Sequence, residues 1–176
     1  MNVISRLVAN RRAWYLGGFG VAAALMAAAL FFQYVQHLEP CPLCIVQRWF
    51  MIAVGLLLLA GGLRQPRGWG QHVYGLLTIL LAGLGAAVAA RHVWIQNLPA
   101  FQQPGCGADL DTMLGHFPLL KAAALVWAGT SDCAAVTWSF LGFSMPAWVL
   151  VCFVGFIVLG LALVFSRPGT GAARPH

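Results

Sequence analysis

Charged residues are scarce in this sequence. Asp, Glu, Lys and Arg together make up 8% of the 176 residues, and only 4 are acidic, whereas about a quarter of an average soluble domain is charged. So few charges cannot cover the surface of a water-soluble domain, and 61% of the residues are hydrophobic. The length suits one domain. We therefore expect a single integral membrane domain over 1–176.

Acidic residues are absent from four long apolar blocks. A helix needs about 20 apolar residues to cross a bilayer, and each block is close to that length. The blocks lack the alternation of barrel strands, and in lipid a helix satisfies every backbone hydrogen bond internally. We predict an all-α, four-helix membrane bundle. The predicted spans are Trp14 to Tyr34, Ile45 to Leu63, His72 to Ala90 and Pro146 to Phe165.

Basic residues gather in three segments that alternate along the chain. By the positive-inside rule these segments are cytoplasmic, so we expect both termini and the tail 166–176 inside, with the loops 35–44 and 91–145 in the periplasm. This clustering accounts for the net charge of +6 without a nucleic-acid partner. The apolar stretch Leu119 to Trp127 is too short to span and predicts a short interfacial helix. The basic residues of these three segments are Arg6, Arg11, Arg12, Arg64, Arg67, Arg167 and Arg174.

Four of the five cysteines fall in the predicted outer loops. Disulfides persist in a bacterial periplasm, and four cysteines allow three pairings. Closeness in sequence favours Cys41 with Cys44, which leaves Cys106 to pair with Cys133. Cys152 lies inside the last apolar block, where a free cysteine behaves as a small hydrophobe, so we leave it out of the site.

The Cys-Pro-Leu-Cys segment is better suited to chemistry than to stabilisation. A bridge over two residues closes a tiny loop and restricts the unfolded chain little. Pro42 fits the first turn of a helix, which makes Cys41 its N-cap and places Cys44 in the opening turn. Helix N-termini lower the pKa of cysteines, and Arg48 lies one turn deeper on the same face. A boundary arginine of this kind is itself a sign of function.

Zinc sites built from cysteines usually contain two Cys-x-x-Cys pairs. Here Cys106 and Cys133 stand far apart, and each lacks a local cysteine partner. We therefore expect no metal site.

The chain resembles the DsbB family, inner-membrane proteins that reoxidise a periplasmic dithiol oxidase of thioredoxin fold with a quinone. The resemblance covers almost the whole chain, and a Cys-x-x-Cys-x-x-x-Arg that opens the second of four spans is its most specific part. The matching segments are Phe32-Gln33, Pro40-Cys41-Pro42-Leu43-Cys44, Gln47-Arg48, Cys106, Ser131-Asp132-Cys133-Ala134, Trp138-Ser139-Phe140-Leu141-Gly142 and Met145-Pro146.

The resemblance implies roles for the four outer cysteines. Cys106 and Cys133 would form the partner-facing disulfide, with Cys106 attacked by a DsbA-like thioredoxin-fold oxidase. Cys41 and Cys44 would form the quinone-proximal disulfide. Electrons would pass from the partner through the outer pair to the inner pair, and then to the membrane quinone pool.

The resemblance also implies a quinone site. Cys44 would be the thiolate that meets the quinone, with Arg48 in support, and His92 matches a family histidine near the quinone. We expect ubiquinone rather than menaquinone. Gln33 and Gln47 either contact the quinone or pair between helices.

Other functions remain open from the sequence. A vitamin K epoxide reductase-like enzyme also has four spans and a Cys-x-x-Cys, but there the motif follows the loop cysteines. A heavy-metal binding or transport protein would keep its cysteines reduced. A structural four-span protein would have no need of Arg48.

Overall fold

Four long helices dominate the computed structural model, which describes residues 11–66, 68–105, 110–136 and 138–165. Cys106, Arg6, Arg67 and the expected tail 166–176 lie outside the described residues. Each long helix has the length and composition to cross a membrane, and each contains one of the predicted spans. The helices are α2 (Arg11–Tyr34), α3 (Pro42–Arg64), α4 (Trp69–Gln96) and α8 (Met145–Phe165).

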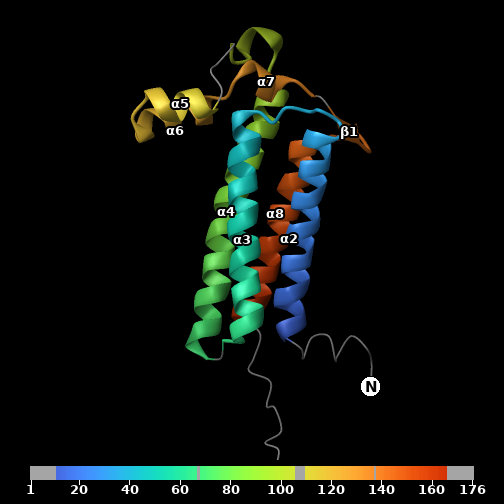
Figure 1. Ribbon diagram of the computed structural model, residues 1–176, viewed down its shortest axis with the longest axis vertical. Coiled ribbons are helices and arrows are strands. Elements are labelled where there is room, and N and C mark those ends of the chain that lie inside the picture. The colour runs from blue at the N-terminus through green and yellow to red at the C-terminus, as the bar shows by residue number, and fades with distance from the viewer. Residues whose placement is uncertain (1–10, 67, 106–109, 137, 166–176) are drawn as a thin grey trace, which may run out of the picture.

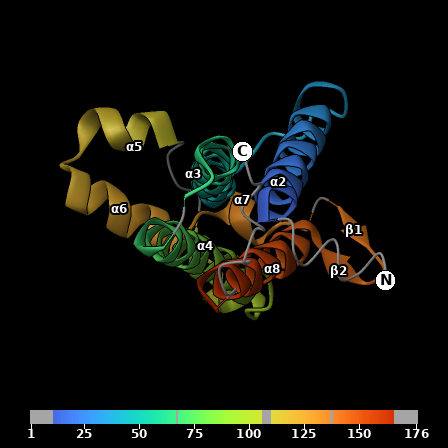
Figure 2. The same ribbon diagram turned by 90° about the horizontal axis from the view of Figure 1, so that it is seen from below.

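The long helices stand side by side as a bundle (Figure 1). Viewed from the end, α3 lies between α2 and α4, and α8 lies beside α4 (Figure 2). α2 packs mainly on α3 and touches α8 much less. Together with the near absence of sheet among the described residues, this arrangement confirms the prediction of an all-α membrane bundle.

Glycines let α4 and α8 approach closely. A Cβ added at Gly75 would lie 3.1 Å from the Gly160 carbonyl oxygen and 2.5 Å from Cγ2 of Val164. A Cβ at Gly85 would lie 2.4 Å from Cε1 of Phe153, whose side chain is fully buried. Helices in lipid associate through packing rather than a hydrophobic drive, so small residues at the contact allow close van der Waals fit.

The ends of α3 and α4 position the residues of interest. Cys41 is the N-cap of α3, with extended backbone, and Pro42 occupies the first turn, as the sequence predicts. α4 continues to Gln96, six residues past the predicted end at Ala90, because hydropathy detects only the lipid-embedded part of a helix. His92 therefore lies on α4, beyond the span that the sequence predicted.

The loop between α4 and α8 contains several short elements. α5 and α6 project to one side of the bundle end, while α7 lies over it (Figure 1). The two strands form a small antiparallel hairpin in which Phe140 pairs with Phe143. The elements are η1 (Ala100–Gln102), α5 (Leu110–His116), α6 (Leu119–Ala128), α7 (Ser131–Ala134), β1 (Ser139–Phe140) and β2 (Phe143–Ser144).

Helix α6 corresponds to the predicted interfacial helix. Ala122 and Val126 are buried, whereas Leu120 is 88% exposed and Trp127 is 50% exposed. An apolar helix that leaves such side chains uncovered suits a position at the membrane surface. Its buried face contributes to a second apolar cluster at the bundle end, composed of Cys41, Leu43, Ile95, Met113, Ala122, Val126 and Cys133.

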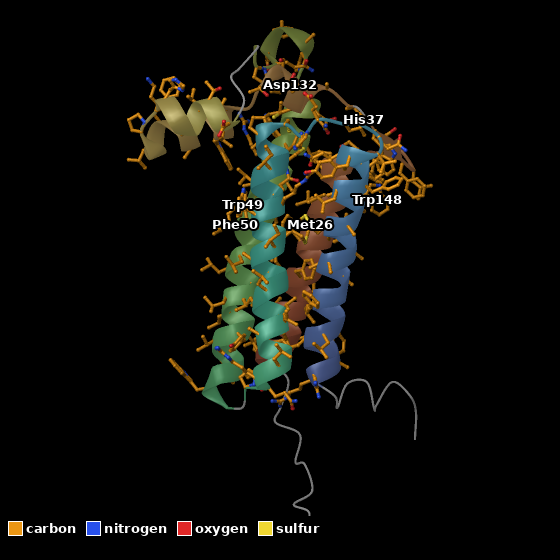
Figure 3. The ribbon with its side chains drawn as sticks, in the orientation of Figure 1. Met26, His37, Trp49, Phe50, Asp132 and Trp148 are labelled. Atoms are coloured by element: carbon orange, nitrogen blue, oxygen red, sulfur yellow. The ribbon has the colours of Figure 1, made fainter. Side chains whose placement is uncertain are left out.

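Aromatic contacts attach the hairpin to the bundle. The ring of Trp138 lies 5.2 Å from that of Phe32 on α2 and 6.0 Å from that of Phe140. Trp148, at the start of α8, donates its indole N–H to the Phe140 carbonyl at 3.1 Å, and it lies at the hairpin end of the bundle in Figure 3. These tryptophans suit a position in the aromatic belt at a membrane interface.

Candidate redox site

Cys41 and Cys44 lie together at the start of α3. Their Sγ atoms are 3.2 Å apart, which is contact rather than the bond length of about 2.0 Å in a disulfide. Cys41 is buried and Cys44 is half-buried. The predicted Cys41–Cys44 disulfide thus stays a prediction, and the structure describes the pair as neighbouring thiols.

His92 lies between the cysteines. Its Nε2 is 3.8 Å from the Cys41 sulfur, and its Nδ1 is 3.9 Å from the Cys44 sulfur. The ring is held by Gln47, whose amide nitrogen is 3.1 Å from Nδ1, and by the Cys133 carbonyl oxygen, 3.1 Å from Nε2. The His92 side chain is 2% exposed. Its contacts connect α3, α4 and α7.

Cys133 reaches the same point from the long loop. Its side chain is fully buried, and the donor atoms of Cys41, His92 and Cys133 lie within 4.8 Å of one another. The Thr130 hydroxyl is 3.7 Å from its sulfur. A hydrogen bond to Cys41, followed by burial, raises the pKa of the Cys133 thiol above its ordinary value.

The turn before α7 depends on Gly129. Its backbone has φ +85°, a conformation that favours glycine, and an added Cβ would lie 2.6 Å from Cδ1 of Ile95 on α4. The close approach lets the loop descend onto α4. Arg91 supports the same contact because its Nε donates to the Trp127 carbonyl at 3.1 Å.

Cys106 lies outside the described residues, but the residue before it is placed. The Ser131 N–H donates to the Gly105 carbonyl at 3.0 Å. This hydrogen bond holds the chain just before Cys106 beside α7, the helix that carries Cys133.

Arg48 turns toward α2. Its guanidinium donates to the Gln33 side-chain oxygen and, at 3.2 Å, to the Ala29 carbonyl. A cation at this depth needs such partners. Gln33 and Gln47 both pair between helices, which is one of the two roles that the sequence left open.

Sequence reasoning did not identify Thr130 as part of the site. It is buried, with an exposure of 1%, and it is the N-cap of α7. One signal in the sequence points to Thr130: threonine is a common helix N-cap, and Thr130 comes three residues before Cys133.

The comparisons with known proteins match this architecture. The family model "Disulfide bond formation protein DsbB" matches residues 10–163. The chain belongs to the DsbB family. Relatives named "Disulfide bond formation protein B" include one from Nitrosococcus oceani, 44% identical over 157 residues, covering 89% of this chain and 92% of the relative. One from Saccharophagus degradans is 50% identical over 143 residues (81% and 86%), and one from Methylobacillus flagellatus is 41% identical over 163 residues (93% and 98%).

Membership of the DsbB family makes the chain a membrane oxidoreductase of disulfide bond formation. It also favours the redox reading of the cysteine cluster over a purely structural role. The comparisons leave the roles of the individual site residues to be argued from their geometry.

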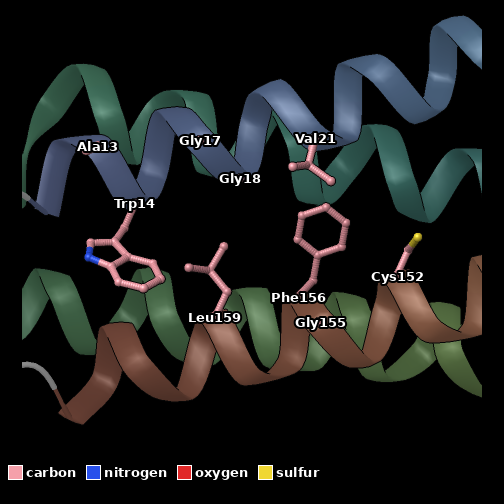
Figure 4. A pocket seen from close by; sticks show the side chains of 9 residues that line it. All are labelled: Ala13, Trp14, Gly17, Gly18, Val21, Cys152, Gly155, Phe156 and Leu159. Atoms are coloured by element: carbon pink, nitrogen blue, oxygen red, sulfur yellow. The ribbon is translucent and has the colours of Figure 1, made fainter. Parts of the chain in front are cut away.

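An apolar groove lies apart from the cysteine cluster. It has a volume of about 490 Å³ and runs between α2 and α8, where Gly17, Gly18 and Phe156 line it (Figure 4). Cys152 also lines it. The groove follows the first half of α2, whereas Arg48 contacts the last turns of that helix, so the groove is separate from the thiol chemistry.

Proposed function

We propose that this DsbB family member is a thiol:quinone oxidoreductase of the bacterial inner membrane. It reoxidises a periplasmic thioredoxin-fold protein that donates disulfides, and it passes two electrons to a membrane quinone. One observation carries the proposal: the buried thiol of Cys133, from the long loop, lies against Cys41, with Cys44 directly behind it.

This contact supports thiol–disulfide exchange between the two loops. When Cys41 and Cys44 are bridged, the Cys133 thiolate attacks the Cys41 sulfur, the Cys41–Cys44 bond breaks, and Cys44 leaves as a thiolate. Cys106 then attacks Cys133 and releases Cys41. Two electrons have moved from the outer pair to the inner pair, and the outer disulfide is restored.

His92 is suited to manage protons during the exchange. Its two ring nitrogens face the sulfurs of Cys41 and Cys44, and an imidazole can accept a proton at one nitrogen and donate one from the other. It can accept a proton from one thiol and return it to the other. This role among the thiols adds to the predicted role of His92 near the quinone.

Between Cys106 and Cys133, Cys106 is the cysteine that the soluble partner attacks. Cys133 has no exposed surface, so a soluble protein cannot reach its sulfur. The backbone hydrogen bond between Ser131 and Gly105 supports a Cys106–Cys133 bridge, because it holds the two cysteines' segments together.

Residues around Cys44 fit a quinone. The guanidinium of Arg48 has five N–H donors, and its two hydrogen bonds to α2 leave others for a carbonyl oxygen. Cys44 is half-buried whereas Cys41 is buried, so Cys44 is the less enclosed of the two cysteines. A bound quinone supplies a sink for two electrons and two protons. Arg48 and Cys44 would hold it, and ubiquinone remains the expected type.

The membrane orientation follows from charge. With the basic segments inside, both termini are cytoplasmic, and α5, α6 and α7 lie on the periplasmic side. The redox cluster then faces the compartment in which disulfides persist.

A turnover assay tests the function. The purified protein is given a reduced thioredoxin-fold partner and either a ubiquinone or a menaquinone analogue, and quinone reduction is followed by absorbance. We expect turnover, its loss in Cys44→Ser, and its retention in Cys152→Ser, a matched control outside the cluster. An absence of turnover with both quinones, or turnover unaffected by Cys44→Ser, would contradict the proposal.

A further inference from the structure

We propose that Cys41, His92 and Cys133 bind a thiophilic divalent cation, Zn²⁺ or a chemical equivalent, when the cysteines are reduced. The residues come from the start of α3, the end of α4 and from α7, and their donor atoms lie within 4.8 Å of one another. The spacing of the cysteines in the sequence predicted no metal site, because Cys106 and Cys133 each lack a second cysteine nearby in the chain. The fold brings distant ones together.

The spacing of the donors suits zinc. Zn–S bonds are about 2.3 Å and Zn–N bonds about 2.0 Å in tetrahedral sites, so neighbouring ligand sulfurs lie about 3.8 Å apart. In the same geometry a sulfur and a nitrogen ligand lie about 3.5 Å apart, and Cys41 Sγ and His92 Nε2 are 3.8 Å apart. The widest pair must close by about 1 Å, within the reach of small side-chain rotations.

The surroundings are those of a prepared metal site. Cys41, His92 and Cys133 are 7%, 2% and 0% exposed. Metal-binding histidines are oriented by a partner at the second ring nitrogen, and Gln47 lies 3.1 Å from Nδ1 of His92. A metal at Nε2 would replace the contact that this nitrogen makes with the Cys133 carbonyl oxygen at 3.1 Å. The imidazole is thus held in place before a metal arrives.

Cys44 offers a fourth ligand. Its sulfur lies 3.2 Å from that of Cys41 but faces Nδ1 of His92, at 3.9 Å, rather than Nε2. The Cys44 side chain therefore has to rotate toward Nε2 to join the other three ligands. Because Cys44 is half-buried, it also provides a route by which the ion enters. Three cysteines and one histidine are a common zinc ligand set.

Binding depends on the redox state, because the thiolate is the metal ligand and a bridged sulfur is not. The reduced protein binds the ion, and the oxidised protein does not. A bound ion occupies Cys41 and Cys133, the two atoms that must meet for exchange. Thiophilic cations therefore hold the protein in its reduced form. Cation binding requires only that the thiols are reduced, and it does not depend on the proposed electron transfer.

Cobalt provides the direct test. The full-length protein, reduced and freed of reductant under anaerobic conditions, is titrated with Co²⁺ in the absence of partner and quinone. We expect thiolate-to-cobalt charge-transfer absorption that saturates near one equivalent and disappears on addition of Zn²⁺. The oxidised protein should show none. Absence of this absorption in the reduced protein, or its persistence in Cys133→Ser, would overturn the inference.

Matched variants assign the ligands. Cys106→Ser and Cys152→Ser should bind cobalt as the wild type does. Gln47→Leu removes only the support of His92 and should weaken binding about 10- to 100-fold. Wild-type affinity in Gln47→Leu, or loss of binding in Cys106→Ser, would count against this ligand set.

A protection experiment needs no variant. Zn²⁺ should shield Cys41 from maleimide in the reduced protein, while Cys106 stays reactive, as judged by peptide mass; the buried Cys133 is labelled slowly with or without the ion. Because no turnover is measured, failure here is distinct from failure of the proposed electron transfer. Equal labelling of Cys41 with and without Zn²⁺ would overturn the inference.

Discussion

The thiol of Cys133 lies against that of Cys41, with the two sulfurs inside a cluster no wider than 4.8 Å. One cysteine caps α3 and the other belongs to α7, so the contact joins two loops that the helices α3 and α4 separate in sequence. Under the proposed function, this contact is the point at which electrons pass from the long loop to the Cys-Pro-Leu-Cys segment.

This contact predicts which cysteines bridge when the others are removed. In the double variant Cys44→Ser, Cys106→Ser, mild oxidation should join Cys41 to Cys133, because their sulfurs need little movement to meet. Non-reducing electrophoresis after maleimide labelling, with peptide mass to assign the bridge, measures the result.

The matched control keeps the other inner cysteine. In Cys41→Ser, Cys106→Ser, the remaining Cys44 and Cys133 should bridge more slowly, at least about tenfold if the geometry costs 1.4 kcal/mol or more. Equal rates in the two double variants would mean that the loop moves freely and that the observed contact does not direct exchange.

The raised pKa of Cys133 predicts a pH effect on its reactivity. A hydrogen bond to Cys41 and burial keep the thiol protonated at pH values where an exposed cysteine ionises. In Cys106→Ser with a chelator present, Cys133 should be alkylated slowly by iodoacetamide until the pH is well above 9. Addition of Cys41→Ala removes the hydrogen bond to Cys41, so the pH midpoint of Cys133 alkylation should fall.

The control retains a hydrogen-bonding atom. Cys41→Ser keeps an oxygen beside Cys133, so its midpoint should shift less than that of Cys41→Ala. Peptide-resolved alkylation rates across the pH range provide the measurement. Identical midpoints in the Ala and Ser variants would show that burial alone sets the pKa of Cys133.

The long helices could be predicted from the sequence because the hydropathy of each span depends only on residues that are consecutive in the chain. Each apolar block became one long helix, and Pro42 marked the start of α3 correctly. The predicted span stopped at Ala90 because the polar pair Arg91-His92 interrupts the apolar run, although Val93, Trp94 and Ile95 continue the helix. That extension matters, because it carries the imidazole to the cysteines.

The cluster itself could not be predicted from spacing. Its geometry depends on the course of the long loop, which turns at Gly129 and is held by the bond from Arg91 to the Trp127 carbonyl. These are contacts between segments far apart in sequence. Family resemblance supplied the roles of Cys41 and Cys133 and singled out His92, whereas the contacts of His92 with the cysteines and the position of Thr130 required the fold.

Arg48 should govern affinity for the quinone. A hydrogen bond from a charged group contributes about 1.5–3 kcal/mol, so Arg48→Met should raise KM for the quinone about 10- to 100-fold and leave KM for the protein partner little changed. Steady-state kinetics with each substrate varied in turn separates the two.

Arg64 supplies a control on the same helix. It lies in the last turn of α3 and donates to the Tyr74 hydroxyl at 3.4 Å, at the opposite end from Cys44. Arg64→Met should leave both KM values near those of the wild type. A similar rise in both variants would indicate a general effect of charge removal on the membrane domain.

The glycine contact between α4 and α8 predicts a difference in stability between two positions of one helix. At Gly75 an added Cβ meets the Gly160 carbonyl and Val164, whereas at Gly83 it meets nothing within 4 Å. Gly75→Val should push the helices apart and lower the free energy of unfolding by about 1–3 kcal/mol, the usual cost of overpacking. Gly83→Val changes the intrinsic helix propensity equally but keeps the packing. The midpoint of thermal unfolding in detergent should therefore fall for Gly75→Val alone, and a similar fall at both positions would assign the effect to helix propensity rather than to the close contact of α4 with α8.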